Sequence, residues 1–303
     1  MRAVGLLLLA LAIPLRADLV TYSSGNDGDV NPRLHGPLLI LEGGGGDVSE
    51  AMQTAIDMIR GCTSCDAKLD VVVLRASGSD GYNGYLMAMN GVDSVVSMVI
   101  TDRESASRAD VVTAVRNAEV VFFAGGDQCN YVKWIKGTAT ADAVKRVYRR
   151  GGGVGGTSAG LAIQGEVVYD ACNGNSAKSV DLLANPMHDD VSLSRGFFSW
   201  PALRGVITDT HFQQRDRMGR LLVFLSRSGE RLGLGVSEGT VLLLRADGRG
   251  TVHGAGPAHV IERTGPTFVI RRFEKGATID LRQLPATGKR IEIVNGLLSA
   301  DPY

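Results

Sequence analysis

The sequence has no excess of charge of either sign, no internal repeat and little cysteine. Thirty-two lysines and arginines balance thirty-two aspartates and glutamates, so no overall field favours nucleic acid or an anionic membrane surface. The four cysteines include one Cys-x-x-Cys pair, Cys62 and Cys65. No second pair at zinc-site spacing follows it, so a structural zinc site is not expected. With 44% hydrophobic and 21% charged residues, the composition is typical of a globular protein.

Long apolar runs are also absent, except at the N-terminus. Met1-Arg2 supplies a positive charge, residues 3–14 are almost entirely apolar, and Ala17 offers a small residue for cleavage. The run is too short for an ordinary membrane span and is typical of a signal peptide. We expect residues 1–17 to be removed and the mature protein to be secreted or periplasmic, without membrane attachment. The alternatives are a buried first strand or an uncleaved anchor.

An oxidising compartment favours disulfides between the four cysteines. Cys62 and Cys65 would close a short loop. Cys129 follows Asp127-Gln128, and Cys172 lies in the loop beyond Ser158. We expect the pairs 62–65 and 129–172 in preference to the other two pairings.

Glycine, in contrast, is abundant, with 39 residues clustered at the ends of expected strands. The densest cluster, residues 151–160, contains Gly156-Thr-Ser158-Ala-Gly160. This Gly-x-Ser-x-Gly pattern is typical of a nucleophile elbow, where small residues permit a turn that exposes the serine. A phosphate-binding turn or tight packing alone would also use such glycines.

Strands alternate with helices through the first two thirds of the chain, which favours a mostly parallel α/β sheet flanked by helices. We expect one domain over residues 18–303, beginning with an extended arm at 18–36. A long loop is expected at 170–198, and residues 240–303 form an antiparallel β extension. The expected strands are 37–42, 69–74, 95–100, 120–123, a short buried strand within 151–157, 203–208 and 233–236. The expected helices are 48–60, 82–90, 107–117, 140–150 and 221–227.

A serine nucleophile needs a base and a group that orients the base. Of five histidines, only His211 directly follows a strand expected in the parallel sheet, and Glu238 ends the next strand. Asp209 and three arginines surround this histidine in sequence: Arg215, Arg217 and Arg220. The plainer interpretation is a solvated helix face with His211 as a helix cap and Glu238 as a turn carboxylate.

Four segments in order resemble the cyanophycinase family of serine peptidases, related to aspartyl dipeptidase. They are Phe123-Ala-Gly-Gly-Asp-Gln128, Gly156-Thr-Ser-Ala-Gly160, Asp209-x-His-Phe-x-Gln-Arg-x-Arg-x-Gly-Arg220 and Gly233-x-Gly-Val-x-Glu238. The resemblance implies a fold like class I glutamine amidotransferases, a three-layer arrangement similar to flavodoxin, and a homodimer.

The resemblance also implies roles for residues. The triad falls on Ser158, His211 and Glu238, and the substrate pocket on Gln128, Asp209, Arg215, Arg217 and Arg220. The N–H of Ala159, with that of Gly125 or Gly126, would form the oxyanion hole. No metal or cofactor is implied. Family members release β-aspartyl-arginine dipeptides from cyanophycin, and they usually have glutamine where this chain has Thr210.

Three hypotheses remain open at this point. The chain is a secreted peptidase acting on cyanophycin, a dipeptidase acting on other aspartyl peptides, or a non-catalytic binding protein with the same fold. A complete set of triad residues favours an enzyme, and serine at the elbow disfavours a glutamine amidotransferase, whose chemistry uses cysteine.

Overall fold

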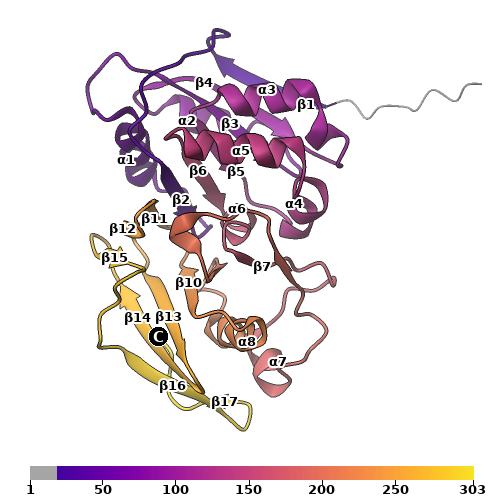
Figure 1. Cartoon of the computed structure of the whole chain (residues 1–303), viewed down its shortest axis with the longest axis vertical. Helices are drawn as coiled ribbons and strands as arrows, with labels where there is room; N and C mark the ends of the chain where they lie inside the picture. The colour runs from indigo at the N-terminus through magenta and orange to yellow at the C-terminus, as the bar shows by residue number, and fades with distance from the viewer. Residues whose placement is uncertain (1–18) are drawn as a thin grey trace, which may run out of the picture.

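The computed structural model describes residues 19–303, so the signal peptide expected at residues 1–17 lies outside the described part. Two sheets organise the described residues, and they occupy the upper and lower halves of the molecule in Figure 1. Among residues 19–303, no helix has the length and apolar character needed to span a bilayer.

The first sheet has a parallel centre that carries an antiparallel extension. The central order is β4 (Val92–Val99), β3 (Leu69–Arg75), β5 (Val120–Phe123), β6 (Gly153–Thr157) and β2 (Leu38–Glu42). All residues of β2, β5 and β6 are buried, which explains their continuous runs of apolar and small residues. Beyond β2 follow β11 (Thr240–Arg245), β12 (Arg249–Gly254) and β15 (Thr278–Asp280), all antiparallel.

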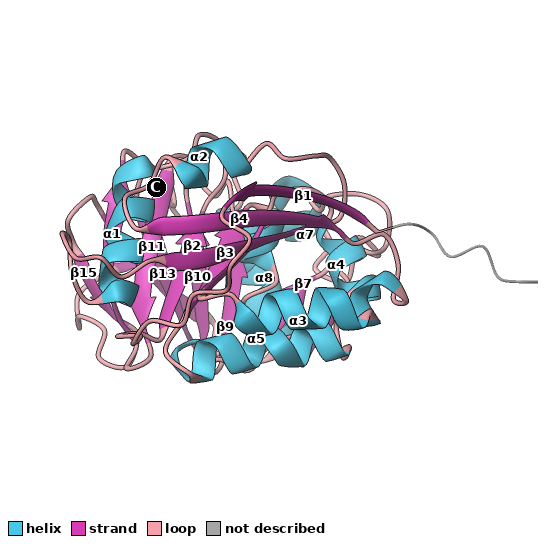
Figure 2. Ribbon diagram, turned by 90° about the horizontal axis from the view of Figure 1, so that it is seen from above, coloured by secondary structure: helices cyan, strands magenta, loops and turns pink. Residues whose placement is uncertain are grey.

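Helices cover both faces of this sheet, which confirms the expected three layers. In Figure 2, α2 (Asn83–Met87) lies above the sheet and α1 (Ser49–Arg60) at its left, and both pack into one core cluster. Helices α3 (Ala109–Asn117) and α5 (Ala139–Arg149) lie below the sheet and pack into the other cluster. Helix α1 buries a stripe of side chains at helical spacing against the sheet: Ala51, Met52, Ala55, Ile56 and Ile59. Such a stripe is what makes an amphipathic helix pack on a sheet. Shorter elements connect these layers: η1 (Ser105–Ser107), α4 (Gln128–Trp134) and α6 (Ala159–Ala162).

The second sheet corrects one expectation. The strands expected at 203–208 and 233–236 are β9 (Val206–Asp209) and β10 (Leu232–Val236), and they do not join the first sheet. They pair in parallel with each other. They cannot continue the first sheet at β2, because antiparallel β11 pairs with that edge of β2. The alternation of strands and helices predicted their direction correctly but could not tell which sheet they join.

The rest of the second sheet is mostly antiparallel. Its order is β17 (Leu297–Leu298), β16 (Lys289–Val294), β14 (Thr267–Phe273), β13 (Ala258–Thr264), β10, β9, β7 (Val167–Tyr169) and β8 (Leu193–Arg195). Helices α7 (Ser179–Ala184) and α8 (Met218–Ser228) pack on it, and η2 (Pro201–Leu203) precedes β9. Most of the β-rich region expected at 240–303 therefore belongs to this sheet, while β11, β12 and β15 extend the first.

Two segments expected to lack regular structure contain short elements. The arm at 18–36 includes β1 (Val20–Gly25), which pairs antiparallel with β4 at the sheet edge. The loop at 170–198 contains α7, whose Leu182 is buried in the cluster formed by α8, and β8, which pairs with β7. Both elements depend on contacts with distant parts of the chain, so local sequence patterns do not reveal them.

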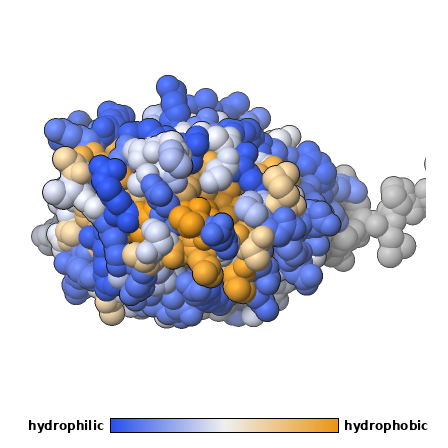
Figure 3. All heavy atoms as spheres, turned by 90° about the horizontal axis from the view of Figure 1, so that it is seen from below, coloured by the Kyte–Doolittle hydropathy of each residue, from blue (hydrophilic) through white to orange (hydrophobic). Residues whose placement is uncertain are grey.

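Exposed apolar side chains gather on the underside of the molecule (Figure 3). Val180 of α7, Met187 just beyond it and Leu297 of β17 are 69–71% exposed. The β16–β17 turn approaches α7 there, since the space beside Gly296 is bounded by Leu183 and Ala184. The end of α7 and the β16–β17 turn therefore lie close together.

Candidate active site

Ser158 sits at the tip of a sharp turn between β6 and α6. Its backbone has φ 53° and ψ −115°, a conformation that non-glycine residues adopt rarely and mostly where function requires it. The turn packs directly on β5, because a Cβ added to Gly156 or Gly160 would lie 2.3 or 2.0 Å from the carbonyl oxygen of Phe123. Only glycine fits these two positions, and the sequence pattern therefore has a steric cause.

His211 and Glu238 reach Ser158 from the second sheet. Ser158 Oγ lies 2.8 Å from His211 Nε2, and His211 Nδ1 lies 2.6 Å from Glu238 Oε1. His211 comes two residues after the end of β9, and Glu238 two residues after β10. The structure thus brings the three expected triad residues into one hydrogen-bonded line that spans the two sheets.

A glycine loop, residues 43–46, holds this line together. The carbonyl oxygen of Gly43 accepts a hydrogen bond from His211 N at 2.7 Å, and that of Gly44 accepts one from Gly239 N at 2.9 Å. Gly44 has φ 92°, and a Cβ there would come within 2.4 Å of the His211 ring. The loop therefore needs glycine both for its backbone conformation and for close approach to the histidine.

The electrostatic surroundings keep His211 able to accept a proton. Burial lowers the pKa of His211, the hydrogen bond to Glu238 raises it in part, and the charges of Arg215 and Arg217 lower it again. The net shift is downward, so the imidazole is neutral at pH 7. A neutral histidine bonded to a serine hydroxyl and oriented by a carboxylate is the arrangement of a serine hydrolase.

Gln214 belongs to the third family-like segment of the sequence, but no role was predicted for it. Its side-chain oxygen accepts a hydrogen bond from Glu238 N at 2.9 Å, so it fixes the turn that carries the carboxylate. Its presence in that segment, directly before Arg215, was the signal that could have pointed to a role.

The three arginines have different surroundings. Arg220 is 2% exposed and holds both carboxylate oxygens of Asp209, with Nε–Oδ2 at 2.8 Å and Nη2–Oδ1 at 2.5 Å. Arg217 Nη1 donates to Thr210 O at 2.9 Å and to Thr210 Oγ1 at 3.0 Å. The Arg215 side chain is 54% exposed, with Nε 3.7 Å from Glu238 Oε1. Arg220 and Asp209 therefore brace the site, and Arg215 is the arginine open to a ligand.

A disulfide borders the expected substrate pocket. Cys129 of α4 is bonded to Cys172, and Cys62 to Cys65, as expected from the sequence. Next to the first of these, Gln128 Nε2 donates to Tyr169 O at 3.3 Å. The guanidinium of Arg220 lies 5.1 Å from the centre of the Tyr169 ring. Gln128 is thus linked through Tyr169 to the arginine cluster.

The residues expected to form the oxyanion hole lie beside Ser158. Ala159 is the first residue of α6, where N–H groups have no partner within the helix. Gly125 lies against the serine, since its Cβ position is 3.5 Å from Ser158 Cβ. Gly126 is exposed and has φ 143°. Ala159 and Gly125 therefore flank the nucleophile, and Gly126 lies next along the chain.

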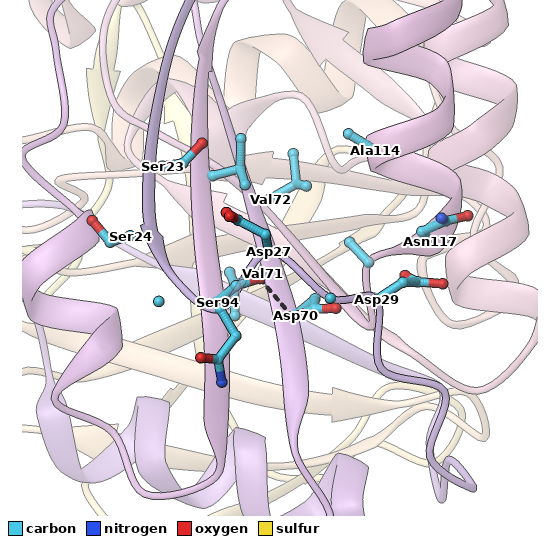
Figure 4. Close-up of a pocket in the computed structure, with 15 residues that line it drawn as sticks. Ser23, Ser24, Asp27, Asp29, Asp70, Val71, Val72, Ser94, Ala114 and Asn117 are labelled. Carbon is cyan, nitrogen blue, oxygen red and sulfur yellow. Dashed lines mark hydrogen bonds between the residues drawn. The ribbon is translucent and has the colours of Figure 1, made fainter.

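The residues drawn in Figure 4 line a separate cavity of about 340 Å³. Asp27, Asp29 and Asp70 contribute carboxylates to it. It lies where β3 and β4 begin, whereas Ser158 follows the end of β6. Asp70 there accepts hydrogen bonds from Val30 N and Ser94 Oγ, so it fastens the N-terminal arm to the sheet. Among the described residues, no group of three or more histidine, cysteine, aspartate or glutamate side chains is placed to hold a metal ion.

Comparison with known proteins gives relatives that match part of the chain. It is 28% identical to cyanophycinase from Synechococcus elongatus over 173 residues, covering 57% of this chain and 50% of that protein. It is 30% identical to cyanophycinase from Geminocystis herdmanii over 184 residues, covering 60% and 63%. The chain thus spans about half to two thirds of the length of these curated relatives.

A solved structure supports the fold. The crystal structure of a peptidase from an acI-B1 Actinobacterium aligns with a TM-score of 0.60 and 18% identity, over 82% of this chain and 98% of that one. The model of peptidase family S51 matches residues 38–251, a range that contains Ser158, His211 and Glu238. The chain belongs to peptidase family S51.

Proposed function

We propose that this protein is an exported serine peptidase in which Ser158 is the nucleophile, His211 the base and Glu238 the group that orients the base. The observation that carries the proposal is the hydrogen-bonded line itself, with 2.8 Å between Ser158 and His211 and 2.6 Å between His211 and Glu238. A binding protein derived from an enzyme has no need to keep all three groups at these distances.

The proposed reaction follows from these roles. His211 Nε2 takes the hydroxyl proton as Ser158 Oγ attacks the peptide carbonyl, and Glu238 stabilises the imidazolium that forms. The N–H of Ala159, with that of Gly125 or Gly126, stabilises the oxyanion. The imidazolium then gives its proton to the leaving amine, and water hydrolyses the acyl-enzyme by the reverse set of transfers.

We propose cyanophycin as the substrate and β-aspartyl-arginine dipeptides as the product. Relatives named cyanophycinase support this choice. The exposed Arg215 is then the group that binds a substrate carboxylate, because a guanidinium matches a carboxylate with two parallel hydrogen bonds. Export, supported by two disulfides, and a homodimer belong to the same proposal, and light scattering on the purified protein tests the dimer.

A dipeptidase acting on other aspartyl peptides is the second candidate. Thr210, which replaces the usual glutamine of the family, accepts two hydrogen bonds from Arg217. An arginine held in this way is less free to contact a long substrate. The Thr210–Arg217 contact is therefore the feature that favours a different aspartyl substrate.

Incubation of the purified protein with cyanophycin and, separately, with a set of α- and β-aspartyl dipeptides decides between the candidates. We expect β-aspartyl-arginine to be the product detected by mass spectrometry. Ser158→Ala should reduce the rate by about 10⁶-fold, while Ser226→Ala, at an exposed serine of α8, should leave it unchanged. Near-normal turnover by Ser158→Ala would exclude this mechanism, and cleavage of dipeptides alone would favour the second candidate.

A further inference from the structure

Glu42 is a buried carboxyl group beside the triad to which no role has been given so far. It ends β2 and is 2% exposed. Its carbonyl oxygen accepts a hydrogen bond from Ser158 N at 3.1 Å. Its side-chain Oε1 accepts one from Val48 N, also at 3.1 Å, and the hydroxyl of Thr157 bonds to the same carboxyl. Glu42 therefore connects the turn that carries the nucleophile to the far end of the glycine loop.

The glycine loop lies between Glu42 and the other two triad residues. It leaves β2 at Gly43, whose carbonyl holds His211 N, and continues through Gly44, whose carbonyl holds Gly239 N. It then returns at Val48 to the side chain of Glu42. The Glu42–Val48 hydrogen bond thus closes the loop that positions both His211 and Glu238.

The charges around Glu42 favour its neutral form. Asp47 is the charged group that acts on its carboxyl, and burial is the larger cause; together they raise the pKa of Glu42 to about 8. The Asp47 carboxyl accepts a hydrogen bond from Tyr82 at 3.2 Å, and burial raises its pKa too. Tyr82, just before α2, and Tyr85 within it are the tyrosines on which the charges of both carboxyl groups act, and the charge of Arg75 of β3 acts on Tyr82. Beyond the loop lie His211, Glu238 and Arg215.

We infer that Glu42 is a positioning residue for the triad: in its neutral form it holds the glycine loop closed, and its ionisation in alkaline solution loosens that loop and lowers the reactivity of Ser158. The second half of this inference rests on the proposed function, and the first half does not.

The physical reason is the cost of a buried negative charge next to a second one. A carboxylate removed from water needs a cation or several donors to compensate it. The hydrogen bonds from Val48 and Thr157 favour the charged form of Glu42, but burial and the charge of Asp47 outweigh them. Of the elements that contact Glu42, β2 and β6 are held by sheet hydrogen bonds on both sides. Residues 43–46 are all glycine and carry no side chains that pack against the rest of the protein, so we expect the glycine loop to be the element that moves.

Hydrogen–deuterium exchange of residues 43–48 tests the loop without requiring activity. Opening exposes Glu42 to water, where its pKa is the ordinary 4.5. Protection of the Val48 amide in the unmodified protein should therefore fall by up to about tenfold for each pH unit from about pH 4.5 toward pH 8. Glu42→Gln keeps an acceptor for Val48 N and cannot ionise, so its protection factors should stay constant. Glu42→Ala removes the acceptor and should lower protection at every pH.

A matched control comes from the other end of the same sheet. Glu119 is 1% exposed, accepts a hydrogen bond from Asp70 N at 2.9 Å, and has a pKa raised to about 7 by burial. Glu119→Gln therefore removes a similar buried acid far from the glycine loop. It should leave the exchange of residues 43–48 and its pH dependence as in the unmodified protein.

Labelling of Ser158 by a small uncharged fluorophosphonate, followed by intact mass spectrometry, tests the effect on reactivity. The labelling rate of the unmodified protein and of Glu119→Gln should decline above about pH 8, as Glu42 ionises. Glu42→Gln should show no such decline, and Glu42→Ala should react slowly throughout.

The outcomes are distinguishable from failure of the proposed function. Absence of any label on Ser158 in the unmodified protein would contradict the proposed peptidase, while exchange would still decide the role of Glu42 in the loop. Equal pH dependence of exchange in Glu42→Gln and the unmodified protein would overturn the inference. The inference would also be overturned if the labelling rate of Glu42→Gln declined above about pH 8 as it does in the unmodified protein.

Discussion

At the scale of single residues, the protonation of His211 makes a direct prediction about pH. The base must be neutral, so activity is lost as pH falls through the pKa of His211. Because burial lowers that pKa below the usual 6.5, we expect hydrolysis to persist below pH 6.5 before it declines. The pH profile of kcat/KM measures this, and an acid limb centred above 6.5 would contradict the proposed surroundings of the histidine.

Arg215 allows its charge and its geometry to be separated. Arg215→Lys keeps a cation near His211 but loses the guanidinium, which can bind a carboxylate through two parallel hydrogen bonds. KM should therefore rise at least about tenfold. The pH below which activity is lost should stay the same, because the charge is kept. Arg215→Ala removes the cation that lowers the pKa of His211, so the acid limb should also move to higher pH. Arg215 would be excluded from the site if both variants had the KM of the unmodified protein and lost activity at the same acidic pH.

The sequence predicted residues whose identity is fixed by chemistry more readily than residues whose role depends on packing. Ser158 was found because the elbow requires glycine at fixed positions on either side of it. His211 and Glu238 were found because each follows a strand. No role was predicted for Glu42 or Gln214, because their hydrogen bonds join segments that come together only in the folded chain.

At the scale of elements, the disulfides differ in the length of chain that they close. Cys129–Cys172 spans 43 positions and Cys62–Cys65 spans three. In the chain-entropy account, the longer loop contributes about 4 kcal/mol and the shorter about 2 kcal/mol to the free energy of unfolding.

The two double variants Cys129→Ser/Cys172→Ser and Cys62→Ser/Cys65→Ser test this difference, because each serves as the control for the other. We expect the first to unfold at a clearly lower urea concentration and to weaken substrate binding, since Gln128 precedes Cys129. The second should lose less stability and keep its activity. Equal stability of both variants, or four reactive thiols in unreduced protein, would contradict the proposed contribution.

Elements with strong local patterns were predicted well, and those held by distant contacts were not. The parallel strands and helices α1 and α5 carry continuous apolar runs or helical stripes. Strand β1 alternates only weakly between exposed and half-buried positions, and α7 is a single short helix that depends on α8. Their formation is a consequence of the sheets being present already.

At the scale of the whole molecule, the two sheets explain why the site depends on the overall fold. The nucleophile belongs to the first sheet, and the base and its carboxylate belong to the second. A loop from the first sheet binds residues of the second through His211 N and Gly239 N. Any shift of one sheet against the other therefore separates Ser158 from His211.

Buried titratable groups also make the stability of the whole molecule depend on pH. The pKa values of Glu42 and Glu119 are raised from 4.5 to about 8 and about 7. Their contribution is complete below pH 4.5 and is lost as pH rises toward 8, because only the unfolded state releases these protons easily. His259 is fully buried, and burial lowers its pKa from 6.5 to about 4. Its contribution is present above pH 6.5 and is lost as pH falls toward 4.

These opposite slopes predict a maximum of stability at about pH 4–4.5, because above it the loss from two carboxyl groups exceeds the gain from one histidine. Two carboxyl groups weaken the folded state above that pH, and one histidine weakens it below. Between pH 5 and 8 the free energy of unfolding should fall by a few kcal/mol, which lowers Tm by about 5–10 °C for a chain of this size. Thermal unfolding in buffers from pH 3 to 9 measures the profile.

Variants assign each slope to its group. The double variant Glu42→Gln/Glu119→Gln should flatten the decline above the maximum. His259→Phe should flatten the decline below it, since neither ring nitrogen of His259 has a hydrogen-bond partner in the described part of the chain and its neighbours are the rings of Phe212 and Tyr303. His188→Phe, at a histidine side chain that is 36% exposed, is the control and should leave the profile unchanged. A stability that rises from pH 5 to 8 would show that these buried groups are not what sets the pH dependence, because their protons can account only for a fall.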